Sequence, residues 1–178
     1  MHRLFVAIRP PHAIRRQLLD LMGGISGARW QTDEQLHITL RFIGEVDGNL
    51  AEDVAAALAS LHQASFDTAL SGVGAFSRRG QAEVVWAGLA PHEPLKALHK
   101  KIDQACVRVG LEPERRAYHP HITLARLKRG AVGPVDAFLE SAGGMSSSPF
   151  RVDSFGLFES TLTPAGAVYS MVRRYPLA

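Results

Sequence analysis

The chain has 178 residues, of which 46% are hydrophobic and 21% are charged, so it can bury the core of one substantial domain. Its formal net charge of +3 is too small for the basic face of a nucleic-acid coat protein. The single cysteine excludes an intramolecular disulfide framework and a cysteine-based zinc cluster, and no apolar run approaches the roughly 20 residues of a membrane span.

Apolar spacing in the first third of the chain predicts alternating strands and helices. The run Leu4–Ile8 is followed by Pro10-Pro11 and indicates a buried strand. Apolar residues then recur at helical spacing from Ile14 to Ile25, which predicts a helix that ends at the glycines of this region. Residues 36–43 are strand-like, and a second amphipathic helix follows with Asn49 as its expected N-cap.

The rest of the chain continues this alternation. The clearest helix runs from Leu95 to Val109 and carries Cys106 on its apolar face, so we expect a buried, unreactive thiol. A short helix is expected over 134–142, and further strands are expected at 66–71, 73–77, 84–89, 121–127, 150–158 and 167–173. No boundary separates independent pieces. We therefore predict one soluble, cytoplasmic α+β domain over residues 1–178.

The tetrapeptide His-Ile-Thr-Leu occurs twice, at residues 37–40 and at 121–124. Each copy lies on a predicted strand between two helices, which indicates two pseudo-repeated lobes related by a two-fold axis. Because side chains alternate along a strand, His37 and Thr39 share one face, and His121 and Thr123 do the same. We therefore predict that both copies face one cleft between the two lobes, with the four polar side chains in it.

This set of side chains suits metal-free cleavage of a phosphodiester. One imidazole can act as a base while another acts as an acid near neutral pH, and two hydroxyls can stabilise charge on phosphate oxygens. A metal site at His37, His119 and His121 is the alternative, which Pro120 and the lack of a carboxylate partner disfavour. We expect neither metal nor cofactor. The residues alone do not decide which histidine is the acid.

Paired His-x-Thr motifs resemble the signature of the two-histidine phosphoesterase superfamily. Three longer runs are similar to its RNA 2′,3′-cyclic phosphodiesterase branch, also called the 2′-5′ RNA ligase family: residues 3–8, 36–46 and 118–126. Val84–Leu89 and Leu157–Ser160 add to this resemblance, which spans nearly the whole chain.

The resemblance implies a bilobal α+β fold of two antiparallel sheets, with helices packed outside and a central groove that holds both motifs. It also implies hydrolysis of terminal 2′,3′-cyclic phosphates on RNA, such as tRNA fragments, or on cyclic nucleotides, to 2′-phosphomonoesters. It implies that His37 is the proton donor, that His121 is the proton acceptor and that Thr39 and Thr123 hold the phosphate. We expect a monomer without a membrane partner. Two alternatives stay open: 2′-5′ ligation in the same site, and a noncatalytic binder of cyclic-phosphate ends.

Four further residues are candidates for substrate contacts. Arg41 follows Thr39 by two positions, so strict alternation places its guanidinium on the catalytic face. Strict alternation turns Arg126 away from that face unless the strand bulges. Tyr118 and Phe42 are candidates to stack on a base, and packing in the core is the alternative for both.

Overall fold

The computed structural model describes residues 1–128 and 133–178 and confirms the α+β prediction. The elements are β1 (His2–Ile8), α1 (His12–Leu21), β2 (Ala28–Trp30), the 3₁₀ helix η1 (Asp33–Gln35), β3 (Ile38–Val46), α2 (Gly48–Ala59), β4 (Phe66–Arg78), β5 (Gln81–Ala90), α3 (Glu93–Arg108), β6 (His121–Leu127), α4 (Gly133–Ala142), β7 (Phe150–Val152), β8 (Ser154–Thr163) and β9 (Gly166–Pro176). In the described part of the chain, no helix is long and apolar enough to cross a membrane.

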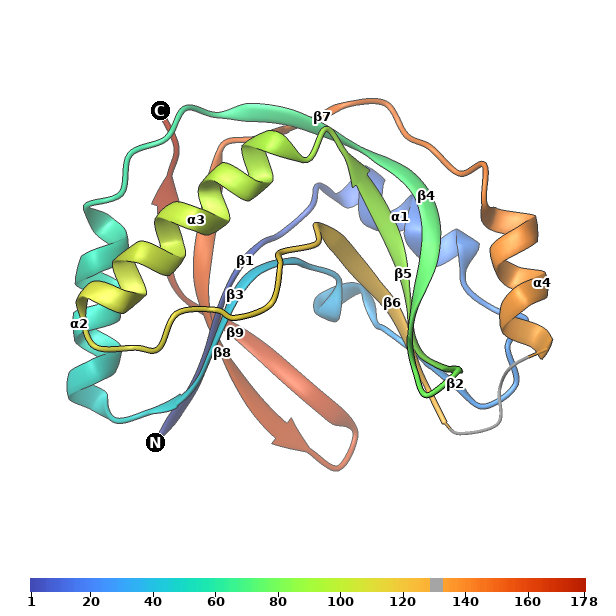
Figure 1. The fold of residues 1–178 in the computed structure, drawn as a ribbon, viewed down its shortest axis with the longest axis horizontal. Helices are drawn as coiled ribbons and strands as arrows, with labels where there is room; N and C mark the ends of the chain where they lie inside the picture. Colours follow the sequence, from blue (N-terminus) through green and yellow to red (C-terminus); the bar gives the residue numbers. More distant parts are fainter. Residues whose placement is uncertain (129–132) are drawn as a thin grey trace.

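The strands form one curved antiparallel sheet in the order β7-β4-β5-β6-β3-β1-β8-β9, with β2 paired to β6 (Figure 1). The two predicted sheets are the two halves of this path. They are joined between β3 and β6 by the residue pair Ile38–Ile122, the central residues of the two repeated motifs. The sheet curls around this junction, so the motifs lie at the middle of its concave side.

The helices pack outside the curved sheet, as the family resemblance implies. In Figure 1, α2 and α3 lie over one half of the sheet, and α1 and α4 lie over the other. The helix α3 buries its apolar face completely, from Leu95 to Cys106, and carries proline in its first turn. Burial raises the pKa of the Cys106 thiol to about 11, so the thiol is buried in the core as expected.

Three local expectations were wrong. The N-cap of α2 is Asp47, whose carboxylate accepts a hydrogen bond from the Leu50 amide at 2.8 Å, rather than Asn49. Helix α1 ends at Leu21, just before Gly23 and Gly24 as expected, but Ile25 does not belong to its apolar face and is buried from a loop instead. The two strands expected at 66–71 and 73–77 are one strand, β4, with a break in its register to β5 between Leu70 and Val73.

Both motif strands contain a β-bulge at the leucine of the tetrapeptide. In β3, Thr39 pairs with Ala7 and Arg41 pairs with Val6, so Leu40 is the extra residue. In β6, Leu124 is extra in the same way, between the paired positions Thr123 and Ala125. Each bulge reverses the alternation of the residues that follow it. Both halves of the sheet therefore contain a β-bulge at the equivalent leucine, which the repeated tetrapeptide alone does not predict.

Candidate active site

A cavity of about 970 Å³ occupies the concave side of the sheet, and both repeated motifs line it. His37, Thr39, His121 and Thr123 all contribute to its wall, so the structure brings together the four residues predicted from the tetrapeptides. The antiparallel register around Ile38–Ile122 sets His37 toward Thr123 and Thr39 toward His121. Each half of the site thus combines an imidazole from one strand with a hydroxyl from the other.

The ring of His37 is enclosed by aromatic side chains and is only 7% exposed. Phe5, Phe158 and Tyr169 surround it with ring centroids 6.0, 4.7 and 5.5 Å away, all close to perpendicular. Among the described residues, neither ring nitrogen has a hydrogen-bond partner.

This enclosure controls the protonation of His37. Burial lowers its pKa to about 4, and the charges of Arg9 and Arg15 act in the same direction. The backbone at Gln35 opposes this shift without reaching hydrogen-bonding geometry. With this pKa, His37 is neutral at physiological pH.

The ring of His121 is held in a defined orientation. Its Nδ1 lies 2.6 Å from the carbonyl oxygen of His119, and because a carbonyl only accepts, Nδ1 carries the proton. The other nitrogen, Nε2, then has a free lone pair. Burial lowers the pKa of His121 too, and the neighbouring His119 and Arg126 add to the shift. A neutral imidazole with a free Nε2 is the form that accepts a proton.

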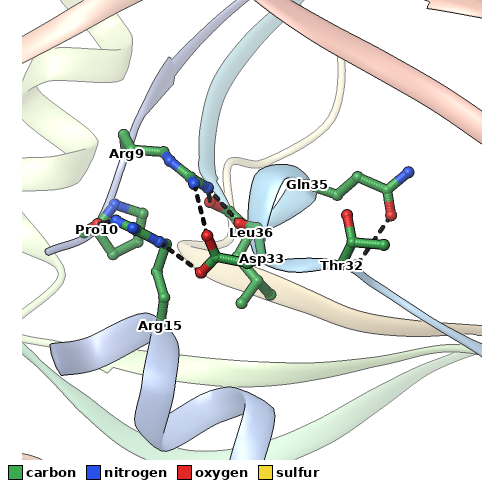
Figure 2. A network of polar contacts seen from close by, with 7 residues as sticks. All are labelled: Arg9, Pro10, Arg15, Thr32, Asp33, Gln35 and Leu36. Atoms are coloured by element: carbon green, nitrogen blue, oxygen red, sulfur yellow. Dashed lines mark hydrogen bonds and ion pairs between the residues drawn. The ribbon is translucent and has the colours of Figure 1, made fainter. Parts of the chain in front are cut away.

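A charged network fixes the segment that leads into the first motif (Figure 2). Asp33 of η1 accepts a hydrogen bond from Arg15 at 2.9 Å and one from Arg9 at 3.3 Å, and Arg9 also donates to the carbonyl of Leu36 at 3.0 Å. The bond from Arg15 holds the pKa of Asp33 below its ordinary value. Gln35 donates to the carbonyl of Ala167 at 2.9 Å, which ties η1 to β9. The backbone before His37 is therefore anchored on both sides.

The expectation that strict alternation places the Arg41 guanidinium beside Thr39 was wrong. Because Leu40 is a bulge residue, Arg41 turns toward α3, where it is 4% exposed and forms an ion pair with Asp103 at 2.9 Å. It also donates to the carbonyl of Glu112. Arg41 borders the cavity, but its guanidinium is bound to protein partners. The pairing with Arg41 helps to keep the pKa of Asp103 low against the effect of burial.

The same bulges turn Phe42 and Arg126 toward the groove. Phe42 is 49% exposed and lines the cavity, so it is not a core residue. Arg126 is exposed and also lines the cavity, as expected for a bulged strand. These two residues occupy equivalent positions, three residues after Thr39 and Thr123.

Tyr118 lines the cavity and also braces the first bulge. Its hydroxyl donates to the carbonyl of Thr39 at 2.9 Å, and its ring stacks on His99 with centroids 4.3 Å apart. His99 in turn lies 2.6 Å from the carbonyl of Leu40. Burial raises the pKa of Tyr118. His99 covers one face of the Tyr118 ring, and the Tyr118 hydroxyl holds the backbone of Thr39. In this structure Tyr118 therefore positions Thr39.

Sequence reasoning missed several residues of the cavity wall. Arg3, Phe76, Arg116 and Tyr169 all line it. Phe76 stands edge-on to His121, with ring centroids 4.9 Å apart and planes at 89°. Alternation in β1 was a usable signal for Arg3, because Arg3 and Phe5 are two residues apart on the same strand. Phe76 and Tyr169 come from segments far from the motifs in sequence, whereas Arg116 lies five residues before His121.

The donor set of the cavity bears on the metal alternative. Within residues 1–128 and 133–178, no three histidine, cysteine, aspartate or glutamate side chains are grouped so as to hold a metal ion. His119 and His121 are near each other, with ring centroids 6.0 Å apart, but His119 packs against Trp86 at 4.8 Å.

Comparison with known proteins shows consistent similarities. Residues 10–163 match the family model of the 2′-5′ RNA ligase superfamily. The chain is 36% identical to an RNA 2′,3′-cyclic phosphodiesterase of Aeropyrum pernix over 77% of this chain and 79% of that one. It is 30% identical to the protein of the same name from Archaeoglobus fulgidus over 96% and 98% of the two chains.

Solved structures agree with this fold. The crystal structure of Escherichia coli LigT complexed with 3′-AMP matches with a TM-score of 0.81 at 27% sequence identity. The match covers 99% of this chain and 98% of that one, so the similarity extends over both halves of the curved sheet.

Proposed function

The chain belongs to the 2′-5′ RNA ligase superfamily, and we propose that it is a phosphoric diester hydrolase that opens terminal 2′,3′-cyclic phosphates of RNA to 2′-phosphomonoesters. The names of its relatives support the cyclic phosphodiesterase activity. One observation carries the rest of the proposal: the two His-x-Thr motifs meet at the pair Ile38–Ile122 and face one cavity.

In this proposal, His37 is the general acid that protonates the departing 3′ oxygen. With a pKa of about 4, its neutral form dominates at pH 7. A phosphodiester in the groove carries one negative charge close to the ring, and an opposite charge favours the imidazolium. Substrate binding therefore shifts His37 toward its protonated form, and the low pKa of the ring makes that imidazolium a strong proton donor.

His121 is the general base that activates water. The bond from its Nδ1 to the carbonyl of His119 leaves Nε2 as the atom that accepts the proton of the attacking water. That carbonyl also stabilises the imidazolium that forms, since it accepts a hydrogen bond from the charged ring. The fixed tautomer of His121, compared with the unpartnered nitrogens of His37, supports this division of roles.

Thr39 and Thr123 hold the phosphate between the two rings. Their hydroxyls donate to non-bridging oxygens and stabilise the charge that increases during attack. Arg126 supports the same oxygens from the rim, where its charge is exposed to the cavity. The reaction adds water across the bond between phosphorus and the 3′ oxygen, so one proton enters at His121 and one leaves from His37. The second turnover needs only proton exchange between the rings and solvent.

The test is incubation of adenosine 2′,3′-cyclic phosphate with the protein in excess EDTA, with the position of the phosphate read by ³¹P NMR. We expect adenosine 2′-phosphate. Exclusive 3′-phosphate would refute the assigned roles of the histidines, and activity that returns only with added Zn²⁺ or Mn²⁺ would refute the metal-free mechanism.

Variants with one histidine removed complete the test. His37→Ala and His121→Ala should each reduce kcat by roughly 10²–10⁴-fold, the usual contribution of a general acid or base. His62→Ala, at an exposed histidine outside the cavity, is the matched control and should retain activity. Losses confined to KM would show that the motif histidines bind substrate without transferring protons.

A further inference from the structure

Arg3 and Phe42 form an exposed pair on the wall of the cavity. Arg3 lies on β1 and Phe42 on the neighbouring strand β3, and the guanidinium carbon of Arg3 is 5.2 Å from the centroid of the Phe42 ring. Both side chains line the cavity. The guanidinium lies over one face of the ring, and Phe42 is still 49% exposed. Exposed aromatic surface next to a guanidinium is the combination that proteins use to hold single-stranded nucleic acid, since it offers stacking for a base and charge for a phosphate.

The position of the pair relative to the catalytic residues limits what it can touch. Thr39 pairs with Ala7, and Phe42 pairs with Phe5. The partners on β1 are two positions apart, so the distance from Thr39 to Phe42 along the strands corresponds to two residues. At about 3.3 Å per residue, the Phe42 backbone lies about 7 Å along the strand from that of Thr39. A phosphate held by Thr39 would therefore leave Phe42 within reach of the adjoining nucleotide.

The charge of the cavity wall fits a polyanion. Arg3, Arg116 and Arg126 line it, and among the described residues none of them forms an ion pair with an acidic side chain. Glu114 is the acidic residue of the described wall. A cyclic mononucleotide carries one negative charge, whereas each further nucleotide adds one. The wall therefore has more cationic groups than the proposed cyclic phosphate uses.

We propose that Arg3 and Phe42 are a binding subsite for the nucleotide on the 5′ side of the cyclic end: Phe42 stacks on its base and Arg3 binds the phosphate that joins it to the terminal nucleoside. This inference rests on the proposed function. It assigns the enzyme a preference for oligoribonucleotide ends over cyclic mononucleotides.

The test compares one substrate of each length. Hydrolysis of the adenylyl-adenosine dinucleotide ending in a 2′,3′-cyclic phosphate is measured beside that of adenosine 2′,3′-cyclic phosphate. Phe42→Leu keeps the apolar packing and removes the aromatic face, Phe42→Trp restores that face, and Arg3→Gln removes the charge. Arg16→Gln, at an exposed arginine on α1 outside the cavity, is the matched control.

We expect wild-type protein to prefer the dinucleotide in kcat/KM. Phe42→Leu should cut this preference roughly 5- to 100-fold, the usual worth of one stacked base, and Phe42→Trp should keep it. For Arg3→Gln, the slope of log(kcat/KM) against log salt for the dinucleotide should become shallower by about 0.7, the value for one phosphate contact on a single strand. Equal losses on both substrates, or no loss, would overturn the inference.

A binding measurement separates this inference from the proposed function. If wild-type protein hydrolyses neither substrate, the proposed function fails, and calorimetry with adenylyl-adenosine 2′-phosphate and with adenosine 2′-phosphate still tests the subsite. The dinucleotide should bind more tightly, and Phe42→Leu should abolish that difference. Identical affinities for both ligands would overturn the subsite.

Discussion

The aromatic enclosure of His37 predicts that this one ring makes the protein less stable in acid. Its pKa is about 4 in the folded protein and about 6.5 in an unfolded chain. At pH 5 the unfolded ring is almost fully protonated, whereas the folded ring is mostly neutral. The unfolded state thus binds more protons, so stability falls as pH falls through 6.5 toward 4.

The size of this effect follows from the two pKa values. The proton-binding polynomial of a ring is 1 + 10^(pKa − pH). At pH 5 it is about 30-fold larger for the unfolded ring than for the folded ring, which lowers the free energy of unfolding by about 2 kcal/mol. At pH 8 both rings are neutral and the contribution vanishes. The free energy of unfolding of His37→Gln, measured relative to wild type, should therefore be about 2 kcal/mol higher at pH 5 than at pH 8.

Urea unfolding of wild-type protein and His37→Gln at pH 5 and pH 8, followed by tryptophan fluorescence, measures this double difference. Constant effects of the substitution on packing cancel, and so do other groups that titrate equally in both proteins. His62→Gln, at an exposed histidine, controls for the loss of a histidine as such and should follow wild type. If His37→Gln and wild type lose stability in parallel within about 0.5 kcal/mol, the aromatic wall does not hold His37 neutral, and the reasoning is refuted.

Three further predictions concern pH dependence, stability and positioning. Because burial lowers the pKa of both His37 and His121, both limbs of the bell-shaped profile of kcat/KM, which reports the free enzyme, should lie below pH 6.5; a maximum above pH 7.5 would contradict this. Arg41→Met should lower the free energy of unfolding by about 3 kcal/mol in urea titrations, because the partly buried carboxylate of Asp103 loses its cation and keeps only the hydrogen bond from the Glu114 amide. Asp103→Asn in the same chain should recover part of the loss, and a raised KM with unchanged stability would instead indicate that Arg41 binds phosphate. Tyr118→Phe should reduce kcat about fivefold with little change in KM, since it removes one neutral hydrogen bond to the motif strand, and a loss in KM alone would show that Tyr118 contacts substrate directly.

Much of the site could be predicted because its histidines and threonines lie in a short tetrapeptide that occurs twice. The tetrapeptide His-Ile-Thr-Leu predicts a half-buried strand. Because side chains alternate along a strand, His37 and Thr39 share one face of the first strand, and His121 and Thr123 share one face of the second. The identical copies then implied a shared groove, which the structure has at Ile38–Ile122.

The orientation of Arg41 could not be predicted, because it depends on a partner strand. The bulge at Leu40 exists where β3 pairs with β1, and nothing in the residues 37–42 distinguishes a bulged from a regular strand. The ion pair with Asp103 stabilises this orientation of Arg41, but Asp103 lies far from Arg41 in sequence. For Arg126, strict alternation left a bulge among the open alternatives, and the structure has that bulge at Leu124.

The enclosure of His37 was hidden for a similar reason. Phe5, Phe158 and Tyr169 come from β1, β8 and β9, and only the sheet order brings these strands beside the first motif. A sequence reading assigns His37 its ordinary pKa, whereas the low value arises from this distant packing.

The pairing of Ile38 with Ile122 has a consequence for how this chain can change in length. A slip of one residue in either strand would exchange the histidine and threonine for the neighbouring isoleucine and leucine, which would carry the polar groups into the core. The strand segments 36–42 and 120–126 should therefore keep a fixed number of residues, so changes in the length of this chain are excluded from both motif strands.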